Sequence, residues 1–191
     1  MTFGGEPLLC PDAVYMIMNT STELNIPCRQ VISNGYFSKD VEEIRDVAKR
    51  LSECRVNDLL LSVDAFHQET IPLDAVKFFA LEAKRNGISA RFQPAWLVNP
   101  DAKNPYNEKT HEILRSLSDT KLPVSDGNIV FPEGNALLYL AEYFTDSSPE
   151  NPYADDPLDI RCLSFSPNGD ILGGNIYRED IMDIIKNYFP Q

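Results

Sequence analysis

The sequence predicts an α/β fold, a partial (β/α) barrel of mostly parallel strands that ends in a C-terminal β-hairpin and a closing helix. Short apolar runs alternate with amphipathic stretches of about 10 to 15 residues, the pattern of right-handed βαβ units around a parallel sheet. The chain has 191 residues, whereas a closed eight-stranded barrel needs about 250. We therefore expect one incomplete barrel domain over residues 1–191, with βα repeats over 1–144, an acidic loop over 145–159, and the hairpin and terminal helix over 160–191.

The first half of the chain alternates strands with helices. Turn and cap residues set the boundaries: Pro11 opens one helix, Asn34 and Gly35 end a strand, and Ser38 caps the next helix. The expected strands are Met1 to Gly4, Cys28 to Ser33 and Asp58 to Asp64. The inward positions of the two helices recur at helical spacing, namely Val14, Ile17, Met18 and Leu24 in the first, and Val41, Ile44, Val47, Ala48 and Leu51 in the second.

The second half continues this alternation. A helix begins at Pro72, and Gly87 ends it in the position that favours left-handed backbone. Pro94 indicates a bulge or an exposed edge in the strand that follows. The expected elements are a helix with Val76, Phe79, Ala80 and Ala83 inward, a strand over Ile88 to Val98, a helix over Asn107 to Leu117, a strand over Asn128 to Phe131, a helix over Pro132 to Phe144, a hairpin of Arg161 to Ser166 with Ile171 and Leu172, and a last helix with Ile181, Ile184, Ile185 and Tyr188 that packs back on the body.

Composition and charge exclude several classes of function. Lys and Arg number 17 and Asp and Glu 29, which gives a net charge of −12. This charge argues against nucleic acids and anionic membrane surfaces as partners. No stretch is apolar for long enough to span a bilayer, and the N-terminus has no basic region followed by an apolar one. We therefore expect a cytoplasmic protein whose substrate is a small molecule or a peptide.

The cysteines predict no metal site. Cys10, Cys28, Cys54 and Cys162 are widely separated, and no pair has the spacing of a zinc or cluster motif. Without a secretory signal, four such thiols are expected to stay reduced and to have structural roles.

Side-chain alternation sorts polar residues to one face of two strands. Ser62 and Asp64 share a face opposite Leu61 and Val63, and Arg91 and Gln93 likewise share a face. Because the helices outside a barrel pack on apolar side chains, we expect the polar set to point inward, where buried polar groups need partners. Two interpretations remain equal at this point: a ligand bound by these residues, or an Asp64–Arg91 pair that satisfies itself.

The first six residues, MTFGGE, place a flexible turn and a carboxylate at the end of the first expected strand. Gly4 and Gly5 allow the backbone to turn tightly and to approach a ligand closely. Glu6 follows at the carboxyl end of the strand, where α/β folds build their sites. A structural Gly-Gly turn with a solvated Glu is the alternative interpretation.

Four segments in the same order resemble the radical S-adenosylmethionine (radical SAM) enzyme superfamily. TFGGEPLL (Thr2 to Leu9) resembles the Gly-Gly-Glu segment after the second barrel strand, and ISNGY (Ile32 to Tyr36) the end of the third. LLLSVDAFHQE (Leu59 to Glu69) resembles the fourth strand, and CLSFSPNGDILGGNIYREDIMDII (Cys162 to Ile185) resembles the C-terminal hairpin and closing helix. Such matches over most of the chain form a family hypothesis.

The resemblance implies a cofactor site. In that family, the backbone and Glu of the first segment, here Gly4, Gly5 and Glu6, hold the amino group of S-adenosylmethionine. The fourth-strand match gives Ser62 and Asp64 the contacts to the carboxylate and ribose of the cofactor. The third-strand match adds Asn34, and the fifth-strand site maps onto Arg91 and Gln93.

The resemblance also implies an activity that this chain does not complete by itself. In an intact parent, a 4Fe–4S cluster would reductively cleave S-adenosylmethionine to a 5′-deoxyadenosyl radical that abstracts a hydrogen atom from substrate. Family members hold that cluster through a CxxxCxxC loop after the first strand, which is absent here. We therefore expect a truncated, inactive fragment of a longer enzyme.

Other functions remain open. A degenerate, non-catalytic barrel that acts as a binding or scaffold module is the main alternative, and an unrelated α/β enzyme for a sugar or phosphate has no motif in this chain. His67, in the loop after Asp64, is a catalytic candidate that could move a proton, with a loop histidine bonded to backbone as the alternative. An unpaired edge at Met1 to Gly4 predicts self-association.

Overall fold

The computed structural model describes residues 1–144, 156 and 158–189. The chain divides into two compact units, Met1–Ser148 and Pro149–Gln191. The acidic loop expected over 145–159 lies almost wholly outside the described residues. Within the described part, every helix is too short or too polar to cross a membrane.

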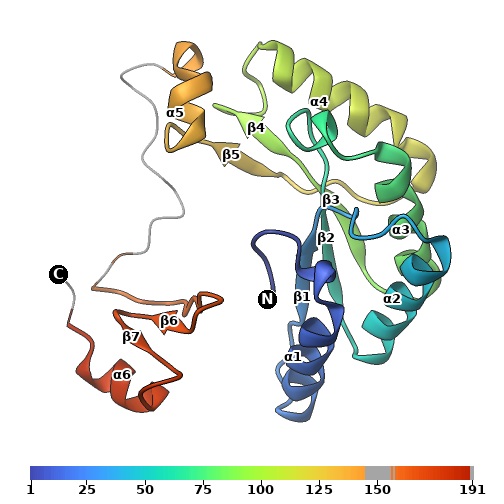
Figure 1. Cartoon of the computed structure of the whole chain (residues 1–191). Coiled ribbons are helices and arrows are strands. Elements are labelled where there is room, and N and C mark those ends of the chain that lie inside the picture. The colour runs from blue at the N-terminus through green and yellow to red at the C-terminus, as the bar shows by residue number, and fades with distance from the viewer. Residues whose placement is uncertain (145–155, 157, 190–191) are drawn as a thin grey trace. The chain divides into compact units, whose positions relative to one another are not determined.

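The first unit is a mixed α/β structure of alternating strands and helices (Figure 1). Its strands are β1 (Gln30–Ser33), β2 (Asp58–Ser62), β3 (Ala90–Gln93), β4 (Ala95–Leu97) and β5 (Asn128–Val130). Its α-helices are α1 (Pro11–Glu23), α2 (Val41–Glu53), α3 (Leu73–Arg85), α4 (Pro105–Ser116) and α5 (Asn135–Tyr139). Short 3₁₀ turns are η1 (Pro7–Leu9), η2 (His67–Glu69), η3 (Ser118–Thr120) and η4 (Ala141–Tyr143).

The main sheet has the order β1-β2-β3, and every pairing in it is parallel. Ser33 lies opposite Leu61, and Ser62 lies opposite Gln93, so the strands end together at one edge. Thr2 forms a parallel bridge to Val31 and extends the sheet beyond β1. The strands are therefore added in chain order, as the sequence predicts for successive βαβ units.

A second, smaller sheet follows where the sequence predicted one longer strand. Pro94 separates β3 from β4, because its missing N–H cannot continue a ladder. The strand β4 then pairs in parallel with β5, and Phe92 of β3 bridges to Val124. No closed barrel is formed by the strands of residues 1–144.

The helices cover one face of the main sheet. Side chains of α1, α2, α3 and α4 form one buried cluster with side chains from the three strands, namely Val31 of β1, Leu59 and Leu61 of β2, and Ala90 and Phe92 of β3. Figure 1 shows α2, α3 and α4 on the same side of these strands. The other parity carries Asp58, Ser62 and Gln93, which are half-buried. The apolar face expected toward the helices is therefore confirmed, whereas the face away from them is mixed, because it also carries Ile32 and the buried Leu60.

Individual helix boundaries differ in places from the sequence prediction. Asp40, rather than Ser38, caps α2, because its carboxylate accepts a hydrogen bond from the Glu42 amide. In α1 the expected inward residues Ile17 and Leu24 are exposed; Tyr15 is buried in their place and packs against the guanidinium of Arg50, 4.1 Å from the ring centre. The stretch from Pro132 to Phe144 forms two short helices, α5 and η4, rather than one.

The second unit contains β6 (Asp170–Ile171), β7 (Gly174–Asn175) and α6 (Ile181–Asn187). The hairpin is antiparallel, as expected, but its strands lie on either side of Leu172 and Gly173, so Arg161 to Ser166 is not one of them. Of the expected inward positions of α6, Ile184 is buried and fills the space beside Gly174, where an added Cβ would meet it at 2.8 Å.

Candidate functional site

The carboxyl edge of the main sheet is organised by the Glu6 carboxylate. Its Oε1 accepts hydrogen bonds from the Leu8 amide (3.0 Å) and the Ser33 hydroxyl (2.9 Å). Its Oε2 accepts one from the Asn34 amide (2.7 Å). Glu6 thus caps η1 and joins the N-terminal segment to the end of β1. The alternative of a merely solvated Glu does not describe this arrangement.

One acceptor position of Glu6 remains open. A carboxylate has about four acceptor positions, and the three bonds above leave one on Oε2. The neighbouring Gly4 and Gly5 have φ values of 90° and 58°, and an added Cβ at either would meet no atom within 4 Å. Within the described residues, neither backbone takes part in a hydrogen bond. The segment therefore offers unpaired backbone groups and a fixed negative charge to a ligand.

Two further residues of the expected site lie along the same edge. Ser62, at the end of β2, is half-buried, and its hydroxyl has no hydrogen-bond partner among the described residues. Asn34, just after β1, uses its side-chain oxygen to accept a bond from the Tyr36 amide (2.8 Å). Gln93, opposite Ser62, bonds to Asn128 (3.1 Å) and to the Ser125 hydroxyl.

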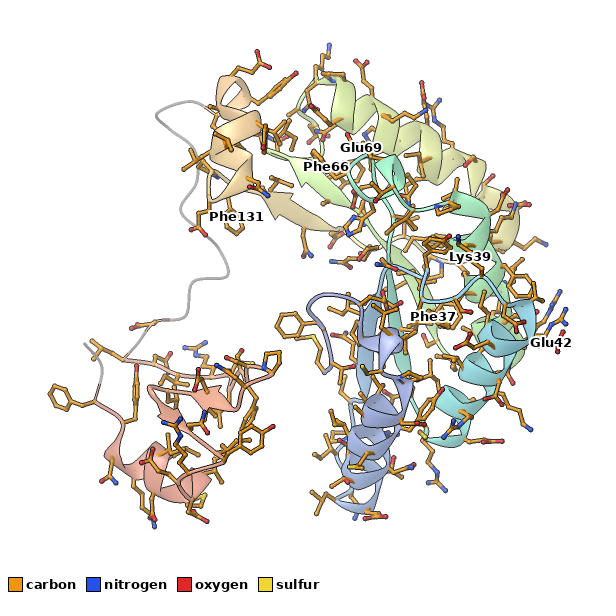
Figure 2. All side chains as sticks on the ribbon, viewed as in Figure 1. Phe37, Lys39, Glu42, Phe66, Glu69 and Phe131 are labelled. Carbon is orange, nitrogen blue, oxygen red and sulfur yellow. The ribbon has the colours of Figure 1, made fainter. Side chains whose placement is uncertain are left out.

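Asp64 is fully buried, and its carboxylate is bonded within the protein. Its Oδ1 accepts from the Phe66 amide (3.0 Å) and the His67 amide (2.9 Å), and its Oδ2 accepts from the Ala95 amide (3.0 Å). The His67 ring nitrogen Nδ1 lies 2.9 and 2.8 Å from the two oxygens. The carboxylate holds the loop after β2 and ties it to β4; Phe66 and Glu69 mark this loop in Figure 2. Ligand contact by Asp64 stays a prediction.

Arg91 is held away from Asp64. Its Nη2 lies 3.0 Å from Oδ2 of Asp58, which also accepts from the Gln30 amide group. Asp58 and Gln30 begin their strands, so this cluster lies toward the amino end of the sheet. The expected alternative of an Asp64–Arg91 pair is wrong, because the register places Arg91 beside Leu60, two residues beyond Asp58 on the same face.

Sequence reasoning missed the residues that support this loop. Thr110 of α4 accepts a hydrogen bond from the Ala65 amide (2.9 Å), and Gln68 accepts one from the Asp64 amide (2.8 Å). Gln68 Nε2 is buried without a partner among the described residues. The polar run of His67 to Glu69 beside a buried strand was the available signal, but the contact from Thr110, 45 positions later, had none.

The cysteines do not fit an iron–sulfur cluster. Cys10, Cys28 and Cys162 are exposed and Cys54 is buried, and all are free thiols. Burial raises the pKa of the Cys54 thiol, which disfavours the thiolate that metals require. Among the described residues, no group of three or more His, Cys, Asp or Glu side chains could hold a metal ion.

Comparison with known proteins adds no family assignment. The sequence matches no protein-family model, and no curated protein matches it as a relative.

Proposed function

We propose that this chain is a S-adenosylmethionine-binding part of a radical SAM protein, with the strands forming a partial (β/α) barrel. The observation that carries the proposal is Glu6, whose carboxylate is fixed at the carboxyl edge with one acceptor position open, beside the unpaired backbone of Gly4 and Gly5. An ammonium group fits this position, because it brings donors and a positive charge to an anion. The addition of parallel strands in chain order, with helices on one face, supports the partial barrel.

The proposed contacts follow the free groups on this edge. Glu6 holds the amino group of the ligand, and the Gly4 and Gly5 backbone approaches it without a side chain in the way. The unpaired Ser62 hydroxyl is available to a ligand carboxylate or ribose hydroxyl. Because the cysteines do not fit a 4Fe–4S cluster, no redox step is assigned to this chain.

Ligand analogues test the role of Glu6. Titration calorimetry would compare S-adenosylmethionine with 5′-methylthioadenosine, which has the same nucleoside but no amino-acid part. We expect Glu6→Gln to weaken the binding affinity for S-adenosylmethionine by about 10- to 100-fold, which corresponds to the loss of a hydrogen bond to a charged group. Binding of 5′-methylthioadenosine should change little. Equal losses for both ligands would assign Glu6 a structural role only.

A binding or scaffold module is the second candidate. It is favoured by the cysteines, which do not fit a cluster, and by the internal bonding of Asp64. A protein that folds normally and binds neither nucleoside would support this candidate and reject the first.

A further inference from the structure

We propose that His67 is a proton acceptor at the carboxyl edge of the sheet, for an O–H or N–H group of a small polar ligand, and that Asp64 is the residue that positions it. The inference goes beyond S-adenosylmethionine binding and does not depend on which cofactor the edge holds. It follows from how the loop after β2 is bonded.

The bonding of Asp64 fixes which ring nitrogen carries the proton. Both carboxylate oxygens accept backbone amides, from Phe66 and His67 on one side and from Ala95 on the other. A carboxyl group bonded in this way acts as an acceptor at both oxygens. The His67 Nδ1 atom, 2.8 Å from Oδ2, must therefore donate, and it carries the ring proton.

The other ring nitrogen is left free to accept. Within the described residues, His67 Nε2 has no hydrogen-bond partner, and the side chain is 37% exposed. His111, the second histidine of the chain, instead packs its ring against Trp96, with ring centres 4.7 Å apart. A lone pair held in one direction at the carboxyl edge of a parallel sheet suits acid–base chemistry.

Gln68 supplies a second, independent indication of a ligand. Its Oε1 accepts a hydrogen bond from the backbone amide of Asp64, and this bond fixes the orientation of the Gln68 side-chain amide. Its Nε2 is consequently a buried donor without an acceptor among the described residues. Buried donors are paired in native proteins, and a bound acceptor would pair this one. The loop thus contains one unpaired acceptor, His67 Nε2, and one unpaired donor, Gln68 Nε2, among the described residues.

The proposed step is a simple proton transfer. The bond from hydrogen to the ligand oxygen or nitrogen breaks, its electron pair stays on that atom, and a new bond forms between hydrogen and His67 Nε2. The imidazolium that results keeps its Nδ1–H bond to Asp64, whose negative charge compensates the new positive charge. The reverse transfer returns the ring to its starting state.

A metal-ligand role for His67 would need further ligands close to its ring. A histidine oriented by a carboxylate is also a common metal ligand. Residues 1–144, 156 and 158–189, however, contain no cluster of three or more side chains able to hold a metal ion. Proton transfer needs no further ligand.

The tautomer of His67 is the first test. In ¹⁵N-labelled protein, long-range ¹H–¹⁵N correlation of the imidazole rings reports which nitrogen is protonated, and His111→Gln assigns the two histidines. We expect His67 to be protonated at Nδ1, and a ring protonated at Nε2 would overturn the proposal. This measurement uses the wild-type chain, so it decides even if variants at Asp64 fail to fold.

Reactivity is the second test, with diethyl pyrocarbonate as the probe. The neutral Nε2 attacks its carbonyl carbon and releases ethyl carbonate, and mass spectrometry follows the modified peptide. We expect Asp64→Asn to slow modification of His67 about tenfold, since an amide donating to Nδ1 moves the ring proton to Nε2. His111 serves as the internal control. A variant that folds and reacts at the wild-type rate would overturn the positioning role of Asp64.

A matched variant separates this role from a structural one. His67→Asn keeps a donor for the Asp64 carboxylate but removes the acceptor at Nε2, so it should fold with nearly wild-type stability. A large loss of stability in His67→Asn would mean that the ring serves packing, and would contradict the proposal.

Discussion

Replacing Glu6 with Ala removes the carboxylate that joins the N-terminal segment to the main sheet. Three donors lose their acceptor: the Leu8 amide, the Ser33 hydroxyl and the Asn34 amide, now at 3.0, 2.9 and 2.7 Å. A hydrogen bond to a charged group contributes about 1.5 to 3 kcal/mol. Because Glu6 is half-buried, water replaces part of this, and we expect a loss of about 2 to 4 kcal/mol in the free energy of unfolding.

Urea unfolding followed by circular dichroism measures this loss. Glu6→Gln should cost less, about 1 to 2 kcal/mol, because the amide oxygen still accepts while the amide nitrogen faces the Asn34 donor. The matched control is Glu23→Ala at the exposed end of α1, which should stay within about 0.5 kcal/mol of wild type. A Glu6→Ala variant as stable as that control would show that the Glu6 carboxylate does not stabilise the link to the main sheet.

Three further predictions concern the core, alkaline pH and self-association. Phe79 is fully buried and makes an edge-to-face contact with Phe37, with ring centres 5.0 Å apart. Phe79→Ala should therefore lower the free energy of unfolding, measured in urea, by about 3 to 5 kcal/mol. A loss under about 1 kcal/mol would contradict this packing. Burial raises the pKa of Tyr15 from 10.0 to about 12, so the unfolded chain ionises first, and the stability contributed by the neutral phenol is complete below pH 10 and is lost between pH 10 and 12. Unfolding curves across that range should show a fall that Tyr15→Phe removes; an equal fall in the variant argues against it. Residues 1–3 present exposed Met1 and Phe3 beside the edge at Thr2, so light scattering should show a mass that rises with concentration, whereas a constant 21.5 kDa would speak against self-association.

The sequence predicted the elements of the first unit well where periodicity and burial agree. The stripe of α3, from Val76 to Ala83, is fully buried as expected, and Gly87 has a φ of 78° after its end. In α1, Tyr15 is buried instead of Ile17. Its packing partner, Arg50 of α2, lies 35 positions away in sequence, so the local pattern could not indicate this contact. The observed hairpin lies closer to Gly174 than the sequence predicted, because strands of two residues have almost no periodic pattern.

The sequence indicated which polar residues lie at the ends of the strands, but it did not indicate how they are bonded. Side-chain parity placed Ser62 on the polar face correctly, and the position of Glu6 after the first expected strand placed it at the carboxyl edge. Parity cannot tell which polar residues pair, since that depends on strand register. The strand register places Arg91 beside Asp58, and the loop after β2 places His67 beside Asp64.

The most direct test of the proposed cofactor site is the amide NMR spectrum of the chain during titration with S-adenosylmethionine. We expect the amide signals of Gly4, Gly5 and Asn34 to shift together with one affinity, and Glu6→Gln to weaken this affinity. Shifts confined to other parts of the chain, or none at all at saturating ligand, would contradict it.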